Sequence, residues 1–411
     1  MSSLHASSLH ASTLYAGGKV FDGETLLPGQ GLLVQGGRIA RIAPLAEFEG
    51  FAGTRIDTAG ATLLPGLIDC HVHLIYSGDG DPRAVCSRMS SGQIVLTALD
   101  NAQESLAGGI TALRDCGGKD YLEFAVRDAC NRGTFQGPAI RCAGRMICMT
   151  GGHGNFIGRV ADGVEEVVKA VREQVHAGSD LIKIMATGGV MTPGVNPQDA
   201  HYSPQEIAAG IAEGHRFHRP CASHAQGRDG ILNAVYGGID SIEHGIFMDE
   251  ICCQAMLERR TFLVPTLAAV RNILAHAGEG VPDYAVEKAR AVAETHRRSI
   301  RMYYEAGGRI AMGTDAGTPF NRHGDNALEL AYMVEIGMAP ADAIKAATID
   351  AAELNRMPDR GRLAEGKLAD LLLVEGDPTQ DIAMAAERKN HRFAVKDGIR
   401  VAARGASRSA P

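Results

Sequence analysis

Short apolar runs alternate with stretches of helical periodicity through the middle of the chain, and this alternation restricts the folds that the chain can adopt. There are eight such runs, each ending in polar or glycine-rich residues, at residues 63–74, 110–116, 139–147, 181–186, 221–225, 241–244, 261–266 and 309–315. Helical periodicity is clearest at residues 161–176, 203–218, 325–336 and 340–355. A strand followed by a helix, repeated eight times, predicts an α/β fold, a parallel (β/α)8 TIM barrel. An open doubly wound sheet is the alternative, although the glycine-rich phosphate turn usual after its first strand is missing.

The two ends of the chain carry a different pattern, short strands interrupted by glycines. Hairpin signals occur near both ends, at Gly36-Gly37 and Asp397-Gly398. Neither end is long enough to bury a core alone, so we expect residues 13–61 and 360–411 to pair into one small discontinuous β-sandwich domain. The barrel would then occupy residues 62–359.

The composition suits a globular protein that acts on small molecules. The formal net charge is −7, and Lys and Arg are nowhere clustered as phosphate binding requires, which argues against a nucleic-acid partner. No apolar run approaches the ~20 residues of a membrane span. Nine cysteines without a C-x-x-C pair predict free thiols in a reducing compartment rather than disulfides. We therefore expect a soluble cytoplasmic protein, with residues 1–12 as a mobile leader.

Histidines, a lysine and an aspartate stand at the ends of five predicted strands, where barrel enzymes place their catalytic groups. The first run ends in His71-Val72-His73, and strand alternation puts both imidazoles on one face. Lys183 stands between two isoleucines in the fourth run. An inward ammonium there would be costly unless it were paired or chemically modified, and the alternative is a lysine that points outward between helices. The later strands end in His224, His244 and Asp315.

These side chains predict a metal site when they are taken together. Alone, His224 or His244 would be a hydrogen-bonded core histidine, and an H-x-H pair is a weak signal. Imidazoles and carboxylates are, however, the ligands that borderline divalent metals prefer. We therefore expect one metal centre in the barrel mouth, built from His71, His73, Lys183, His224, His244 and Asp315.

The sequence motifs at these strand ends resemble those of the amidohydrolase superfamily. The motifs that carry the resemblance are PGLIDCHVHL, LIKIMATGGV, SHAQG, SIEHG and GTDAG. The late segment GRLAEGKLADL is similar to the segment through which chains of that superfamily return into the β-sandwich. MTGGHG around His153 and FNRHGDN around His323 resemble a narrower group, the prolidase-like dipeptidases that include ochratoxin-degrading amidohydrolases. The resemblance covers nearly the whole chain after the leader.

The resemblance implies a site with two divalent metal ions, usually zinc. It assigns one ion to His71, His73 and Asp315 and the other to His224 and His244. Lys183 would bridge the two ions as a carbamate derived from CO2. A plain ammonium would be repelled by two dications, whereas its carbamate is an anionic bidentate ligand.

The implied reaction is hydrolysis of an amide whose leaving group is an amino acid, in a dipeptide or in an N-acyl amino acid such as an ochratoxin-type N-acyl-phenylalanine. A metal-bound hydroxide would attack the carbonyl, and Asp315 would pass its proton to the leaving nitrogen. His153 is the second catalytic candidate, because it could hydrogen-bond the oxyanion or bind a substrate carboxylate. His323 and Gln226 are candidate substrate-binding residues, although either histidine could instead be an ordinary polar loop residue. Gln226 stands where many prolidase-like relatives carry Tyr, which weakens the expectation of a simple Xaa-Pro preference.

Two other functions stay open. One is ring opening of a cyclic amide or lactone, or deamination, within the same superfamily, and Lys183 counts against a deaminase because deaminases usually use one metal and lack the bridging lysine. The other is a non-catalytic scaffold, but such proteins lose metal ligands, and every expected ligand position is filled here.

Relatives are commonly multimeric, so we expect a homo-oligomer. On the second strand, Arg114 and Asp115 are predicted to form a structural ion pair.

Overall fold

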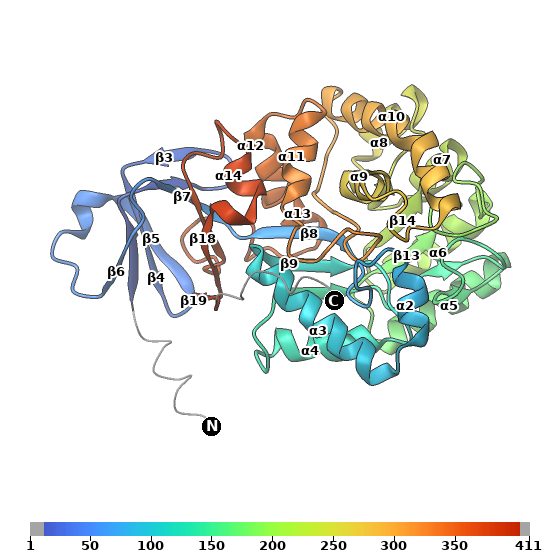
Figure 1. Cartoon of the computed structure of the whole chain (residues 1–411), viewed down its shortest axis with the longest axis horizontal. Coiled ribbons are helices and arrows are strands. Elements are labelled where there is room, and N and C mark those ends of the chain that lie inside the picture. Colours follow the sequence, from blue (N-terminus) through green and yellow to red (C-terminus); the bar gives the residue numbers. More distant parts are fainter. Residues whose placement is uncertain (1–11, 403–411) are drawn as a thin grey trace.

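The computed structural model describes residues 12–402. Residues 1–11 of the expected mobile leader and residues 403–411 of the expected second domain lie outside this described part. Figure 1 shows two groups of elements, parallel strands flanked by helices on one side and the strands of the chain ends on the other. The fold is therefore α/β, as the sequence predicts.

The strands of the central part pair in parallel and form two sheets. The first has the order β10-β9-β8, with β8 at Leu67–Val72, β9 at Ile110–Asp115 and β10 at Ala139–Cys142. The second has the order β12-β11-β13-β14-β15-β16, with β11 at Ile147–Cys148, β12 at Arg159–Val160, β13 at Ile182–Met185, β14 at Cys221–Ala225, β15 at Ser241–His244 and β16 at Phe262–Val264. The predicted parallel strands are present, but within residues 12–402 their pairing gives two sheets rather than one closed sheet.

The eighth predicted strand, residues 309–315, is not a regular strand. Isolated parallel bridges tie this segment and the residue that follows it to β16 on one side and to β8 on the other. Regular pairing is interrupted because the amides of Thr314 and Asp315 both donate to the carbonyl of His71, at 3.3 and 2.7 Å. The segment thus connects the two sheets and brings Asp315 next to the end of β8.

The first and third predicted strands are each divided. Residues 63–74 contain the end of β7 (Ala61–Pro65), which joins the sheet of the chain ends, and then β8. Gly66 separates them at a crossing so close that a Cβ there would lie 2.3 Å from the side chain of Thr111. Residues 139–147 likewise contain β10 and the start of β11, which belong to different sheets. An apolar run in the sequence does not show where a strand leaves one sheet for another.

The strands of the chain ends form two further sheets, with the orders β5-β4-β1-β6 and β19-β18-β17-β7-β2-β3. Their bounds are β1 Thr13–Ala16, β2 Lys19–Phe21, β3 Leu26–Pro28, β4 Gln30–Gln35, β5 Arg38–Pro44, β6 Thr54–Asp57, β17 Leu371–Glu375, β18 His391–Lys396 and β19 Ile399–Arg400. β17 pairs antiparallel with β7, so strands from both ends of the chain share one sheet. The turn residues Gly36, Gly37, Asp397 and Gly398 all have positive φ, which confirms both predicted hairpins. Between the sheets lies a buried apolar cluster that includes Val20, Leu32, Leu371 and Val395.

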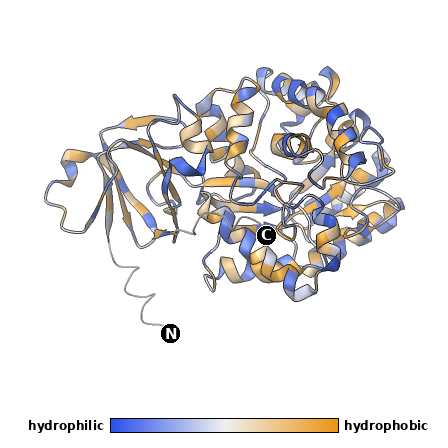
Figure 2. Ribbon diagram, in the orientation of Figure 1, coloured by the Kyte–Doolittle hydropathy of each residue, from blue (hydrophilic) through white to orange (hydrophobic). Residues whose placement is uncertain are grey.

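Helices cover the parallel sheets, and Figure 2 shows that they carry hydrophilic and hydrophobic residues side by side. Their bounds are α2 Pro82–Arg88, α3 Ser91–Ala107, α4 Leu122–Asn131, α5 Gly163–Ala177, α6 Pro204–Arg216, α7 Arg228–Gly237, α8 Glu250–Arg259, α9 Leu267–Ala275, α10 Asp283–Glu305, α11 Leu328–Glu335, α12 Pro340–Ala346, α13 Ile349–Leu354 and α14 Ala383–Ala386, with short 3-10 helices at Leu45–Phe48 and Arg388–Asn390. The helix expected at residues 203–218 is confirmed as α6, which begins after Ser203, where Ser203 and Glu206 form a capping box. The helix expected at residues 340–355 is split into α12 and α13, because Thr348 has a non-helical backbone.

Two expectations come from the composition, free cysteines and no membrane-spanning segment, and the structure bears on both. All nine cysteines are free and buried, which confirms the predicted thiols. Within residues 12–402, no helix is long and apolar enough to cross a membrane.

Candidate functional site

The six predicted metal ligands line one cavity. They come from β8 and the residue after it, from β13, β14 and β15, and from the segment between β16 and β8: His71, His73, Lys183, His224, His244 and Asp315. The predicted alternation on the first strand is confirmed, because the rings of His71 and His73 both reach the cavity, with centroids 5.5 Å apart. Residues far apart in the sequence are therefore brought to one site, at the carboxyl ends of parallel strands.

Each of the four imidazoles is fixed by a protein group at one ring nitrogen. The contacts are His71 Nδ1 to Glu243 Oε2 at 2.8 Å, His73 Nδ1 to Gly117 O at 2.8 Å, His224 Nε2 to Gly188 O at 3.0 Å and His244 Nδ1 to Thr266 Oγ1 at 2.7 Å. Thr266 donates its own hydroxyl proton to the carbonyl of Pro265, so it accepts from His244. Metal-binding histidines are usually held in this way, with a carboxylate, carbonyl or hydroxyl on the nitrogen that does not bind the metal.

The protonation of the histidines also suits metal binding. Burial lowers the pKa of His71, His224 and His244 well below the usual value, so these imidazoles are neutral at pH 7 and keep a lone pair. His73 differs, because burial lowers its pKa but the contact with Asp315 more than compensates and raises it. A metal ligand must be a neutral imidazole, so three of the four already have the required form.

Asp315 lies where the two histidines of the first strand converge. Its Oδ1 is 3.5 Å from His71 Nε2 and 3.3 Å from His73 Nε2, and these three side chains form a group that could hold a metal ion. Gly313 makes this approach possible, since a Cβ there would lie 2.9 Å from the Cβ of His71. Asp315 has φ 61° and His244 has φ 72°, backbone conformations that cost energy in residues other than glycine. Such strain is typical of sites where function dictates the position of a side chain.

Lys183 points into the cavity rather than outward between helices. It is buried, and its Nζ lies 3.5 Å from Nε2 of His71. It forms no ion pair with any carboxylate in the described part of the chain. A buried amine without an anionic partner is costly, which is the situation that the sequence predicts for an inward lysine.

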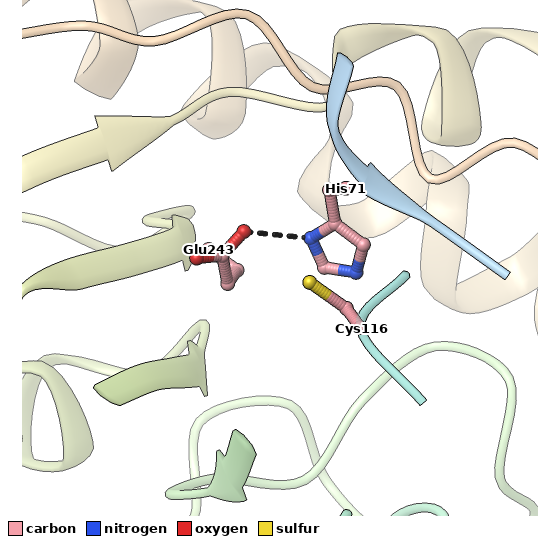
Figure 3. A group of neighbouring side chains, drawn as sticks. All are labelled: His71, Cys116 and Glu243. Atoms are coloured by element: carbon pink, nitrogen blue, oxygen red, sulfur yellow. Dashed lines mark hydrogen bonds and ion pairs between the residues drawn. The ribbon is translucent and has the colours of Figure 1, made fainter. Parts of the chain in front are cut away.

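Glu243 is a functional residue that the sequence analysis missed. Figure 3 shows it beside His71, and its other carboxylate oxygen accepts from Arg114 Nη2 at 2.8 Å and from Ser241 Oγ at 2.6 Å. The only signal in the sequence was a carboxylate between Ile242 and His244 inside a predicted strand. The predicted ion pair between Arg114 and Asp115 is wrong, since Arg114 pairs with Glu243 and Asp115 instead accepts from backbone amides.

His71, Cys116 and Glu243, drawn in Figure 3, are a second group close enough to hold a metal ion, but the contacts of Glu243 with His71 and Arg114 favour a supporting role. Burial raises the pKa of the Cys116 thiol to about 12, so it is protonated. Glu243 is already neutralised by Arg114. The contact between His71 Nδ1 and Glu243 therefore fixes the orientation of the ring, and Nε2 faces the cavity.

The three predicted substrate-binding residues lie in different places. His153 and Gln226 line the cavity, and the ring of His153 lies 4.4 Å from that of His224. Burial lowers the pKa of His153 to about 3, and its Nδ1 contacts Thr192 Oγ1 at 2.7 Å. His323 does not line the cavity, because it lies behind His73 with its ring nitrogens at Ser105 Oγ and at the carbonyl of His73, both at 3.2 Å.

Comparison with known proteins agrees with this arrangement. Residues 62–401 match the amidohydrolase family. The chain belongs to the amidohydrolase family. Among its relatives, the ochratoxinase of Aspergillus niger is 34% identical over 370 aligned residues, which cover 82% of this chain and 75% of that protein.

Solved amidohydrolase structures are similar over almost the whole chain. A Xaa-Pro dipeptidase with methionine bound in its active site superposes with a TM-score of 0.87 at 32% identity, covering 95% of this chain and 99% of that one. The A. niger ochratoxinase structure has a TM-score of 0.83 at 30% identity, covering 95% and 96%. The resemblance found in the sequence is confirmed, and the protein is a hydrolase that acts on amide bonds.

Proposed function

We propose that this chain is a binuclear metal-dependent amidohydrolase that cleaves the amide bond of dipeptides or N-acyl amino acids. The observation that carries the proposal is the set of four imidazoles, each fixed at one ring nitrogen by a protein group, in residues that line one cavity. Asp315 and Lys183 complete the donor set. A scaffold protein without chemistry would have no reason to keep four oriented imidazoles in one cavity.

The donor set fits two divalent ions, and zinc is the metal that such ligands suit best. One ion would be held by His71, His73 and Asp315, whose ligand atoms lie within 4.8 Å of one another. The other would be held by His224 through Nδ1 and His244 through Nε2, the nitrogens left free by their contacts with the protein. When bound, the ions would supply Lewis acidity, which acidifies water and polarises the scissile carbonyl.

Lys183 would join the two halves of this site as a carbamate formed with CO2. The support for this proposal is its burial beside His71 without a carboxylate partner in residues 12–402. Carboxylation replaces a buried cation by an anionic ligand, so it relieves the cost of burial and completes the donor set in one step.

Asp315 would carry the proton in the reaction. Burial raises the pKa of this carboxyl group, but His71 and His73 outweigh that effect, so its pKa lies below the usual value and it is ionised at neutral pH. An ionised carboxylate can accept a proton from the attacking water and deliver it to the leaving nitrogen. His153 would stabilise the oxyanion, because a hydroxyl proton of Thr192 on Nδ1 leaves the ring proton on Nε2 as a donor.

The substrate would carry an apolar side chain and a secondary amide. The walls of the cavity are largely apolar, with Met146, Phe156, Met185, Val190 and Ile246 among them. Gln226 Oε1 is a buried acceptor without a hydrogen-bond partner among residues 12–402, so a substrate N–H would satisfy it. An Xaa-Pro bond has no N–H to offer. The related dipeptidase with methionine in its active site and the related ochratoxinase support an amino-acid product of this kind.

A substrate panel tests the proposal. We expect the zinc-loaded protein to cleave N-acyl aromatic amino acids and dipeptides with a secondary amide, and to cleave Xaa-Pro dipeptides poorly. Elemental analysis of the purified protein should give two metal ions per chain. Turnover of a lactone or a cyclic imide without turnover of any linear amide would show that the substrate class is wrong.

We also propose that the parallel strands form one (β/α)8 barrel at residues 62–359 and that the chain ends form a separate β-sandwich. Support comes from the segment 309–315, which contacts β16 and β8, and from Asp180, whose amide donates to the carbonyl of Cys142 between the two parallel sheets. The expected cytoplasmic location and homo-oligomer stay predictions.

A further inference from the structure

Arg83 is a cation in the wall of the cavity. It lies in the first turn of α2, which begins after the N-cap Asp81. The carboxylate of Asp81 accepts from the amide of Ala84 at 3.0 Å and so belongs to the helix start. In residues 12–402, no carboxylate forms an ion pair with Arg83. Its guanidinium carbon instead lies 4.2 Å from the ring centroid of Phe156.

Two of the other arginines that lie over aromatic rings, Arg127 and Arg271, show what is missing here. Arg127 lies at the same distance, 4.2 Å, from the ring of Phe124, but it also forms ion pairs with Asp128 and Asp180 at 2.9 and 3.1 Å. Arg271 stacks on Tyr332 and pairs with Glu335 in the same way. Both arginines pair with carboxylates of the protein, whereas the charge of Arg83 is available to an anionic ligand.

The surroundings of Arg83 strengthen its attraction for an anion. Besides Lys183, which belongs to the metal ligands, Arg83 is the one residue with a lysine or arginine side chain among those lining this cavity. Its neighbours in the wall include Pro82, Phe156 and Ile157, and apolar walls exclude water and reduce screening. The guanidinium carbon lies over the ring of Phe156, and a guanidinium can donate two parallel hydrogen bonds to a carboxylate.

We propose that Arg83 binds the free carboxylate of the substrate and makes the enzyme selective for N-acyl amino acids with a free α-carboxylate and an apolar side chain. This inference rests on the proposed function and deepens it. The carboxylate would pair with Arg83, the side chain would contact the apolar wall, and the scissile amide would reach Asp315 in the same cavity. Esters and amides of the same amino acids would lack the ionic contact.

The test compares an acid with its neutral analogue, N-benzoyl-L-phenylalanine with N-benzoyl-L-phenylalaninamide. Charge-assisted hydrogen bonds contribute enough for about a 10- to 100-fold preference, so the native enzyme should favour the acid by that factor in kcat/KM. Arg83→Met should lower kcat/KM for the acid, mainly through KM, so that the ratio of the values for acid and amide falls to about 1. Arg83→Lys should keep part of the preference, because the charge remains. The matched control Arg127→Met, which removes an arginine with an equal stack outside the cavity, should keep the full preference.

Binding measured by calorimetry separates this inference from the proposed function. The zinc-loaded enzyme should bind L-phenylalanine more tightly than L-phenylalaninamide, and Arg83→Met should abolish the difference. If this dependence on Arg83 is seen but no amide is hydrolysed, the proposed function fails and the carboxylate site stands. If Arg83→Met keeps the preference for the acid, or if the native enzyme shows none in either measurement, the inference is overturned.

Discussion

Asp315 is the residue on which the proposed chemistry depends most directly, because it contacts both histidines of the first strand. Asp315→Asn keeps the shape and one oxygen ligand but cannot accept a proton. We expect a loss of about 10²- to 10⁴-fold in kcat, the usual contribution of a positioned acid–base group, with most of the metal retained. Steady-state kinetics and metal analysis on the same sample would check this. The control Asp229→Asn changes a largely exposed carboxylate on α7 and should leave kcat and the metal content unchanged. Near-native turnover of Asp315→Asn would rule out its role as the base.

Glu243 should act on the metal through His71. Its carboxylate holds Nδ1 of His71 and is itself held by Arg114, so the imidazole is fixed with Nε2 toward the cavity. Loss of such a support typically weakens metal affinity about 10- to 100-fold, and we expect Glu243→Gln to fall in this range. Competition with a zinc chelator would measure the affinity.

A second buried carboxyl group provides the control for Glu243. Glu123 is fully buried on α4 and contacts none of the four histidines, so Glu123→Gln should leave the zinc affinity unchanged. Equal zinc affinity in Glu243→Gln and the native protein would show that His71 does not need this support.

The sequence predicts the candidate ligands better than their supports, for a physical reason. His71, His73, Lys183 and Asp315 stand at strand ends, and the order of elements alone brings strand ends together. Glu243 supports a residue 172 positions away, and that pairing depends on the registers of β8 and β15. The same limitation explains His323, whose ring nitrogens contact residues 218 and 250 positions away in the sequence rather than the cavity.

At the scale of elements, α10 holds the loop that covers one side of the site. Lys288 Nζ donates to three backbone carbonyls of this loop, those of Gly189, Thr192 and Val195, at 3.2, 2.7 and 2.6 Å. The hydroxyl of Thr192 contacts His153, and the carbonyl of Gly188, in the same loop, accepts from His224. A single ammonium on α10 therefore helps to place two residues of the cavity.

Removing that ammonium should loosen the loop without touching the cavity itself. We expect Lys288→Met to raise KM and lower kcat, with kcat/KM about 10- to 100-fold lower, because small displacements of positioning groups are costly. Hydrogen–deuterium exchange should become faster at residues 187–200. The control Lys169→Met removes an exposed lysine of α5 that pairs with Glu166. It should change neither the kinetic constants nor the exchange rates at residues 187–200. Unchanged exchange at residues 187–200 in Lys288→Met would show that other contacts hold the loop.

Elements defined by local signals could be predicted from the sequence, and those defined by tertiary contacts could not. The capping box at Ser203 and the turn at Gly36-Gly37 depend on neighbouring residues only, and both are present. The division of the first run at Gly66 depends on the distant Thr111, and the irregular segment 309–315 depends on the carbonyl of His71. Periodicity contains no information about either contact.

At the scale of the whole molecule, the proposed metal ions would join parts of the chain that are far apart in sequence. The candidate ligands extend from His71 to Asp315 and belong to both parallel sheets and to the irregular segment that connects them. An ion that binds only the folded chain stabilises it by about 4 kcal/mol when its concentration is 1,000 times its dissociation constant. Metal binding should therefore contribute to the stability of the whole central part.

Chelation tests this contribution and the carbamate together. Because about 1 kcal/mol shifts the Tm of a large domain by roughly 2–4 °C, removal of the metal should lower Tm by about 5 °C or more and abolish activity. Zinc should restore both, and restoration should be faster with added bicarbonate, because the carbamate on Lys183 forms from CO2. Lys183→Arg keeps a cation that cannot be carboxylated in the same way, so its Tm should respond less to zinc and not at all to bicarbonate. A Tm and an activity that resist chelation would argue against a metal centre, whereas recovery that ignores bicarbonate would argue against the carbamate alone.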